Sequence, residues 1–137
     1  MGFSIARRIE YACPPGHQLF ISPIDFDLAG GQRVEPDIIV VPSASVGEKR
    51  LSGPALLVVE IVSPGSVTND RVTKREVYAA AGVPAYWIID PRSFHVLALR
   101  LVDGAYVPYV DTTGPVTIDW PVAVSFSVAD LARPRAP

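Results

Sequence analysis

The chain has 137 residues, of which 49% are hydrophobic and 19% are charged; this composition fits one folded domain and excludes a largely disordered chain. Its single cysteine, Cys13, excludes a disulfide scaffold. With no signal peptide and no apolar run near the roughly 18 residues of a membrane helix, we expect a cytoplasmic protein without a membrane span. The net charge of −2 does not favour tight nucleic-acid binding through charge alone.

The first third of the chain predicts a helix followed by two strands. Apolar residues recur at helical spacing over residues 3–12, and Pro14-Pro15 ends that helix. Residues 19–28 alternate between apolar and polar side chains, which predicts a single half-buried strand. Because Pro23 cannot donate a ladder hydrogen bond, we place this strand near a sheet edge. Residues 37–41 predict the second strand.

The middle of the chain predicts a loop, a central strand and a helix. Residues 43–53 are mostly polar and predict a loop. Residues 55–62 are apolar except for Glu60, which is typical of a strand buried on both faces in the middle of a sheet. Residues 67–81 predict a helix, and Gly82 suits the position just after its last turn.

The last third predicts mainly strands. A buried strand is expected over residues 85–90, and alternating strands follow. These are predicted over residues 94–102, 106–110, 116–118 and 122–126, before a last short helix that ends at Leu131. Strands and helices in this order predict an α/β fold of the α+β kind, with a mixed sheet, in one domain over residues 1–137.

Two carboxylates carry the functional prediction. Glu60 lies inside an otherwise apolar strand, where a buried charge is costly unless something pairs with it. If its strand neighbours residues 37–41, Asp37 and Glu60 converge at one end of the sheet and repel each other unless a cation lies between them. Mg²⁺ prefers such oxygen ligands. The alternatives are a Glu60 paired with a buried cation and an Asp37 that only forms a turn.

The predicted helix over residues 67–81 supplies a third group. Asp70, Lys74 and Tyr78 follow one another at intervals of four residues, so they share one face of that helix. Because this helix directly follows the strand of Glu60, it should pack back over the sheet and bring Lys74 towards the carboxylates. An ammonium group there can position a water molecule and offset phosphate charge. The alternative is a solvated Asp–Lys pair of little energetic weight.

Four motifs together carry a resemblance to a known family. They are Glu35-Pro36-Asp37 with the apolar run after it, Leu57-Val58-Val59-Glu60-Ile61-Val62-Ser63-Pro64-Gly65-Ser66, Asp70-x3-Lys74-x3-Tyr78, and residues 81–91 (AGVPAYWIIDP). In this order and over about residues 17–131, the sequence resembles the Uma-type restriction endonuclease family, a bacterial branch of the PD-(D/E)xK nuclease superfamily.

The resemblance implies a restriction-endonuclease-like mixed central sheet flanked by helices. It implies that Asp37 and Glu60 bind Mg²⁺ or Mn²⁺, with the backbone carbonyl of Ile61 completing the metal site. The superfamily's lysine usually stands two residues after the Glu, where this chain has Val62. In the Uma-type branch the lysine lies on the next helix, which points to Lys74. Recurrent family positions are also matched by Ser63, Asp70 and Tyr78, which are expected to support the site.

The sequence departs from the family pattern in two places. Family members usually have a strand pair with an acidic residue before the first helix, whereas this sequence starts inside that helix and Glu10 is no clear replacement. Ala85 stands where Glu is common. The chain is therefore expected to lack the usual N-terminal strands.

Three hypotheses follow from the sequence. The first is a metal-dependent endonuclease that hydrolyses DNA phosphodiester bonds, with Asp37, Glu60 and Lys74 as its catalytic residues. The second is a catalytically inactive nuclease-fold module for binding or assembly, and the third is a fragment of a longer gene product. For so short a domain with an incomplete first helix, we also expect a homodimer that covers exposed apolar surface.

Overall fold

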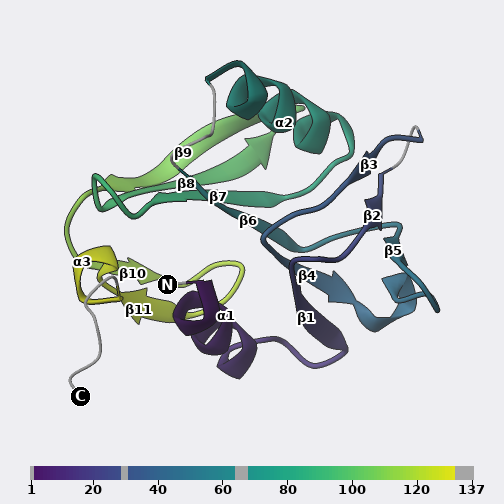
Figure 1. Cartoon of the computed structure of the whole chain (residues 1–137), viewed down its shortest axis with the longest axis horizontal. Coiled ribbons are helices and arrows are strands. Elements are labelled where there is room, and N and C mark those ends of the chain that lie inside the picture. Colours follow the sequence, from purple (N-terminus) through teal and green to yellow (C-terminus); the bar gives the residue numbers. More distant parts are fainter. Residues whose placement is uncertain (1, 29–30, 64–67, 132–137) are drawn as a thin grey trace.

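The computed structural model describes residues 2–28, 31–63 and 68–131, and a mixed sheet lies at its centre (Figure 1). The six strands of this sheet follow the order β1-β4-β6-β7-β8-β9. The neighbours β6 and β7 are parallel, and every other pair in the sheet is antiparallel. The strands are β1 (His17–Ile21), β4 (Ile38–Pro42), β6 (Leu57–Ile61), β7 (Ala85–Asp90), β8 (His95–Val102) and β9 (Ala105–Thr112). The α+β class with a mixed central sheet is confirmed.

Each face of the sheet is covered by its own hydrophobic core. One core joins the sheet to α1 (Gly2–Tyr11), to the hairpin of β10 (Val116–Ile118) and β11 (Val124–Phe126), and to α3 (Val128–Leu131). The other core lies under α2 (Thr68–Ala80) and a small second sheet. Figure 1 shows α2 on one side of the central sheet and α1, α3 and the hairpin on the other. No helix among the described residues is long and apolar enough to cross a membrane.

The central position predicted for residues 55–62 is confirmed. The strand β6 has β4 on one side and β7 on the other, and Leu57, Val58 and Val59 are fully buried. Side chains alternate between the two faces of a strand. Val58 therefore packs into the core under α2 while Leu57 and Val59 pack into the opposite core. By the same alternation, Glu60 faces α2.

The helix α2 ends in the motif that Gly82 predicts. Gly82 has a φ of 77°, and its amide donates to the carbonyl of Ala79 while the amide of Val83 donates to the carbonyl of Tyr78. This pair of bonds is a Schellman motif, which satisfies carbonyl groups that the helix end would otherwise leave without partners. The motif fixes where α2 stops and therefore which helical residues lie over β6.

The single strand predicted over residues 19–28 is wrong. The chain leaves the central sheet after β1, passes through the cis Ser22–Pro23 peptide, and forms the short strand β2 (Phe26–Asp27) in another sheet. The predicted edge position holds, because β1 ends the strand order. The predicted common face also holds, since the apolar residues of both pieces pack into the core under α2; they are Phe20, Ile24, Phe26 and Leu28.

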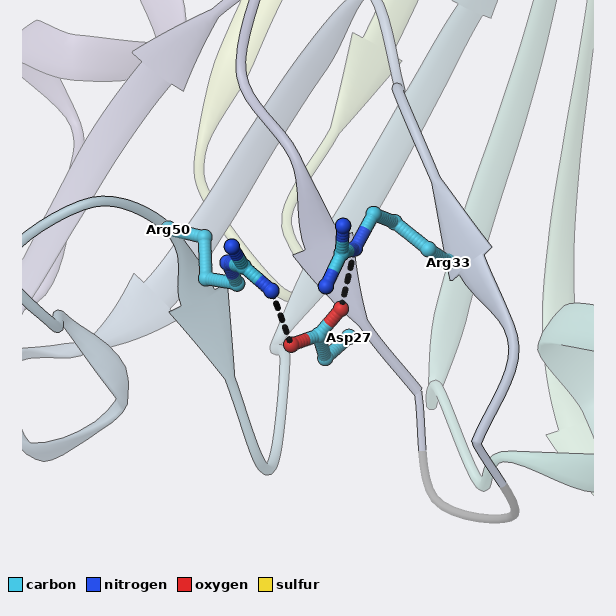
Figure 2. Close-up of polar contacts among 3 residues, drawn as sticks. All are labelled: Asp27, Arg33 and Arg50. Carbon is cyan, nitrogen blue, oxygen red and sulfur yellow. Dashed lines mark hydrogen bonds and ion pairs between the residues drawn. The ribbon is translucent and has the colours of Figure 1, made fainter.

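The small sheet occupies part of the region predicted as a polar loop. It pairs β2 with β3 (Arg33–Val34) and with β5 (Leu51–Ser52), and a 3-10 turn (Ser43–Ser45) precedes β5. Asp27 lies between two arginines from the flanking segments, as Figure 2 shows. Its Oδ1 accepts a hydrogen bond from Arg33 Nε at 2.7 Å, and its Oδ2 lies 3.6 Å from a terminal nitrogen of Arg50. These contacts link three short strands that pairing alone holds weakly.

The remaining elements follow the sequence prediction closely. The helix expected over residues 3–12 is α1, and strands appear near each position predicted after residue 90. Between β8 and β9, Asp103 and Gly104 both have positive φ, 49° and 82°. This is the backbone that an Asp-Gly hairpin turn requires.

Candidate active site

The pairing of β4 with β6 brings the two predicted carboxylates together. These strands are antiparallel, with Ile38 opposite Val59, so the next position places Asp37 beside Glu60. The backbone amide of Ile61 donates a hydrogen bond to Asp37 Oδ2 at 2.7 Å. Asp37 stands at the start of β4 and Glu60 near the end of β6, so both carboxylates lie at one end of the sheet, as predicted.

Glu60 is the buried member of the pair, with 8% of the residue exposed. The hydroxyl of Tyr78 in α2 donates to Glu60 Oε1 at 2.8 Å. Lys74 Nζ lies 3.8 Å from Glu60 Oε2. The helical spacing of Lys74 and Tyr78 therefore places both side chains over the same carboxylate, one on each of its oxygens.

Burial and a second carboxylate weaken the acidity of Glu60. The pKa of Glu60 is raised from 4.5 to about 7; loss of hydration is the largest cause, and repulsion by Asp37 acts in the same direction. Lys74 and the Tyr78 hydroxyl act in the opposite direction. Burial, followed by the charge of Glu60, also raises the pKa of Tyr78, so its hydroxyl keeps its proton and stays a donor.

A cavity of about 350 Å³ opens beside Asp37 at this end of the sheet. Its walls come from the first turn of α1, the end of β1, the start of β4 and the chain after β6, and they include Gly2, Ile21, Ser22, Asp37, Ile61 and Ser63. Glu60 and Lys74 lie on the α2 side of Asp37 and do not line this cavity. Asp37 is therefore the residue that joins the cavity to the buried carboxylate.

The three residues predicted to support the site do not share one place in the structure. Tyr78 is buried and bonded to Glu60, and Ser63 is exposed and lines the cavity. The side chain of Asp70 lies outside the described residues. Ile21 and Ser22 were not predicted as site residues, because only the pairing of β1 with β4 brings them to Asp37. Pro23 predicted that its strand lies at an edge of the sheet, but it did not predict that this edge lies beside the carboxylates.

The donor set is compatible with a hard divalent cation. Asp37 Oδ2 and Glu60 Oε1 each accept a hydrogen bond, so the candidate ligand atoms are Asp37 Oδ1 and Glu60 Oε2, the second of which lies 3.8 Å from Lys74 Nζ. Within the described part of the chain, no group of three or more His, Cys, Asp or Glu residues could hold a metal ion. Zinc commonly takes three or four protein ligands, whereas Mg²⁺ is held by one or two carboxylates and keeps several waters. A site with two carboxylates suits Mg²⁺ or Mn²⁺ better than zinc.

Comparisons with known proteins agree with this architecture. The model of the Uma2 family, described as "Putative restriction endonuclease", matches residues 3–131. Among solved structures, the chain is similar to a putative nuclease belonging to DUF820 from Anabaena variabilis ATCC 29413, with a TM-score of 0.71 and 17% sequence identity. That similarity covers 96% of this chain and 77% of the other, and at this identity it shows the fold. A search of curated proteins found no match.

Proposed function

The chain belongs to the Uma2 family, and on that premise we propose that it is a divalent-metal-dependent endonuclease that hydrolyses phosphodiester bonds in DNA. The observation that supports this most is the meeting of Asp37 with the buried Glu60, under a helix that carries Lys74. Two carboxylates that lie side by side, one of them lining a cavity, are stabilised by a cation, and a lysine beside them suits chemistry on an anionic substrate.

Asp37, Glu60 and the carbonyl of Ile61 are the groups proposed to hold Mg²⁺ or Mn²⁺. When bound, such an ion acts as a Lewis acid on the phosphate and lowers the pKa of water. Asp37 is oriented by the amide of Ile61, and Glu60 is oriented by the hydroxyl of Tyr78. These two hydrogen bonds fix the orientation of the carboxylates before any ligand binds. The two side chains therefore lose little further conformational freedom on binding.

Lys74 is proposed to act on the water and on the phosphate. Its side chain is 37% exposed while that of Glu60 is 11% exposed, so the ammonium lies at the boundary between the buried carboxylate and solvent. At 3.8 Å the ion pair with Glu60 is long. The ammonium can therefore turn towards a phosphate oxygen and stabilise the charge that develops there as the attacking water bonds to phosphorus.

A nuclease-fold module that binds without cleaving is the second candidate. The apolar Val62, at the position where the superfamily usually has its lysine, favours this reading, as does the net charge of −2. Both features lower the affinity for a polyanion such as DNA. In this case the carboxylates and Lys74 persist as a structural ion pair.

The experiment that tests the proposal is nicking of supercoiled plasmid in Mg²⁺ or Mn²⁺. We expect the wild type to cleave, and Asp37→Ala, Glu60→Ala and Lys74→Ala each to lose at least about a hundredfold in rate, as loss of a metal ligand or a charge-stabilising group does. The matched controls are Asp119→Ala, Glu48→Ala and Lys49→Ala, which remove the same groups at exposed positions.

The proposal fails if the wild type does not cleave, or if all three site variants keep full activity. Circular dichroism of each variant separates loss of chemistry from loss of fold. A wild type that binds DNA and leaves it intact supports the binding-module candidate instead.

A further inference from the structure

The turn between β7 and β8, residues 91–94, lies at the same end of the central sheet as the candidate active site. The strands β6 and β7 are parallel, and just past the end of β6 the amide of Val62 donates to the carbonyl of Ile89. The next residue, Ser63, lines the cavity beside Asp37. The turn joins the ends of the first and second neighbours of β6. At about 4.8 Å between strands, it therefore lies within roughly 10 Å of the end of β6.

Phe94 stands in this turn on a backbone that disfavours its side chain. Its φ is 63°, in the left-handed region, which bulky residues rarely adopt. Glycine, asparagine and aspartate adopt it at lower cost. The other non-glycine residue with positive φ in the described part of the chain is Asp103, whose residue type suits its turn. Residues strained in this way cluster where proteins bind ligands.

Packing does not account for Phe94. The residue is 42% exposed and belongs to neither of the two hydrophobic cores that the described residues form. An aromatic ring stabilises a fold by removing apolar area from water, and this ring leaves much of its area in water. Its position therefore combines a disfavoured backbone with an exposed apolar surface, beside the candidate site.

Arg92 adds a positive charge to the same turn. Its amide donates to Asp90 Oδ1 at 2.9 Å, while its side chain is exposed and forms no ion pair with another described residue. On the neighbouring strand β9, Asp111 Oδ1 lies 2.6 Å from His95 Nε2. Both carboxylates next to the turn thus have partners, and Arg92 is the charge that the turn itself presents to solvent.

We propose that this turn holds an unpaired DNA strand beside the candidate site, with Arg92 on a backbone phosphate and the Phe94 ring stacked on a base. This rests on the proposed endonuclease function. A guanidinium binds phosphate through charge-assisted hydrogen bonds, and an aromatic ring stacks on any base. At about 3.4 Å per nucleotide, the turn lies within roughly three nucleotides of a phosphate at the end of β6. The turn therefore adds affinity without selecting a sequence.

Two asparagine substitutions test the role of Phe94. Phe94→Asn and its control Asp103→Asn both place asparagine on left-handed backbone, the control in the turn after β8, at the opposite end of the sheet. Binding is followed by fluorescence anisotropy of a labelled single-stranded DNA without divalent metal. Phe94→Asn should raise the dissociation constant by about fivefold to a hundredfold, as loss of one base stack does. Asp103→Asn should change it by less than about twofold.

Thermal unfolding of the same proteins separates binding from folding. Phe94→Asn should keep or raise the melting temperature of the wild type, because asparagine tolerates this backbone. A clear fall would show that the ring is kept for packing and would overturn the proposal. If the wild type binds no DNA, the proposed function fails as well. If the wild type binds and nicks DNA and Phe94→Asn binds as tightly, the role of the turn alone is overturned.

Salt dependence tests the phosphate contact of Arg92. Between about 50 and 200 mM salt, Arg92→Gln should lower the slope of log affinity against log salt by about 0.7, the value for one phosphate contact on a single strand. The control is Lys49→Gln, an exposed charge in the segment that joins β4 to β6 at the other end of the sheet, and it should keep the wild-type slope. An unchanged slope for Arg92→Gln, or an equal change in both variants, overturns the contact.

Discussion

Glu60 is the residue at which folding and the proposed function oppose each other. A carboxylate there is desolvated and lies beside Asp37, which raises its pKa to about 7. An apolar residue in the same strand would pack without this cost. The site therefore stores an electrostatic cost in the metal-free protein, and a bound cation would relieve it.

This cost predicts a dependence of stability on pH. The unfolded chain loses the Glu60 proton near 4.5, whereas the folded chain keeps it to about 7. The contribution of this group to folding free energy is thus intact below about 4.5 and is lost as the pH rises through about 7. A shift of this size corresponds to a few kcal/mol. Without metal, Glu60→Gln should gain stability relative to the wild type between pH 5 and pH 8.

Urea denaturation of both proteins at several pH values measures this difference. Comparing the two proteins at each pH cancels the titration of every other group that behaves alike in both. A difference in unfolding free energy that stays constant from pH 5 to pH 8 would contradict the account of Glu60.

Tyr78 predicts a second effect at the residue scale. Tyr78→Phe removes the hydroxyl that donates to Glu60, leaving a buried carboxylate oxygen without that donor. We expect a loss of about 1–3 kcal/mol in stability and a loss of about tenfold to a hundredfold in cleavage rate. The control is Tyr106→Phe, whose hydroxyl donates to the carbonyl of Val83 away from the carboxylates.

The readouts are denaturation and plasmid nicking. Both variants should lose stability, but only Tyr78→Phe should lose activity after correction for the folded fraction. If Tyr106→Phe reduces the cleavage rate as much as Tyr78→Phe does, the hydroxyl of Tyr78 has no special role in the site.

At this scale the sequence predicted that Asp37, Glu60 and Lys74 come together, and it missed Ile21 and Ser22 in the cavity wall. The meeting of Asp37, Glu60 and Lys74 could be inferred on the condition that two strands consecutive in the chain are neighbours, and because helical spacing is regular. Ile21 and Ser22 could not, because their place beside Asp37 depends on which strand pairs with β4. No local signal in the sequence encodes that choice.

At the scale of elements, the end of α2 sets the position of Lys74 and Tyr78 over β6. Gly82 holds a φ of 77°, and no atom lies within 4 Å of where a Cβ would be. Gly82→Ala therefore adds no clash, and its cost is conformational, about 1–2 kcal/mol for a left-handed backbone. The control is Gly114→Ala, where the nearest atom to the added Cβ is Thr112 Oγ1 at 3.7 Å and φ is not positive.

Thermal unfolding measures both variants. Gly82→Ala should lower the melting temperature clearly, and Gly114→Ala should leave it almost unchanged. Equal effects of the two substitutions would show that the left-handed backbone at Gly82 does not hold the end of α2.

Elements with strong periodicity were predicted well, and the two-residue strands were not. The helix α2 and the strands β6 and β7 have long apolar or helical patterns. The division of residues 19–28 into β1 and β2, and the two-residue strand β5, were missed. Strands this short are too brief for a period to be visible and depend on tertiary partners, such as the Asp27 contacts in Figure 2.

At the scale of the whole molecule, the central sheet separates two cores, and the candidate site lies where they meet at one end. The α2 side supplies Lys74 and Tyr78, and the α1 side supplies the cavity wall at Gly2 and Ile21. Neither layer alone assembles the site. We propose that Asp37 and Glu60 together bind a divalent cation at this junction.

Calorimetric titration of Mn²⁺ into the protein at pH 8 tests that claim most directly, with Asp37→Asn and the exposed control Asp119→Asn measured beside the wild type. We expect saturable binding by the wild type and by Asp119→Asn, and at least about a tenfold weaker affinity for Asp37→Asn. Equal binding by all three proteins, or no binding by the wild type, would contradict it.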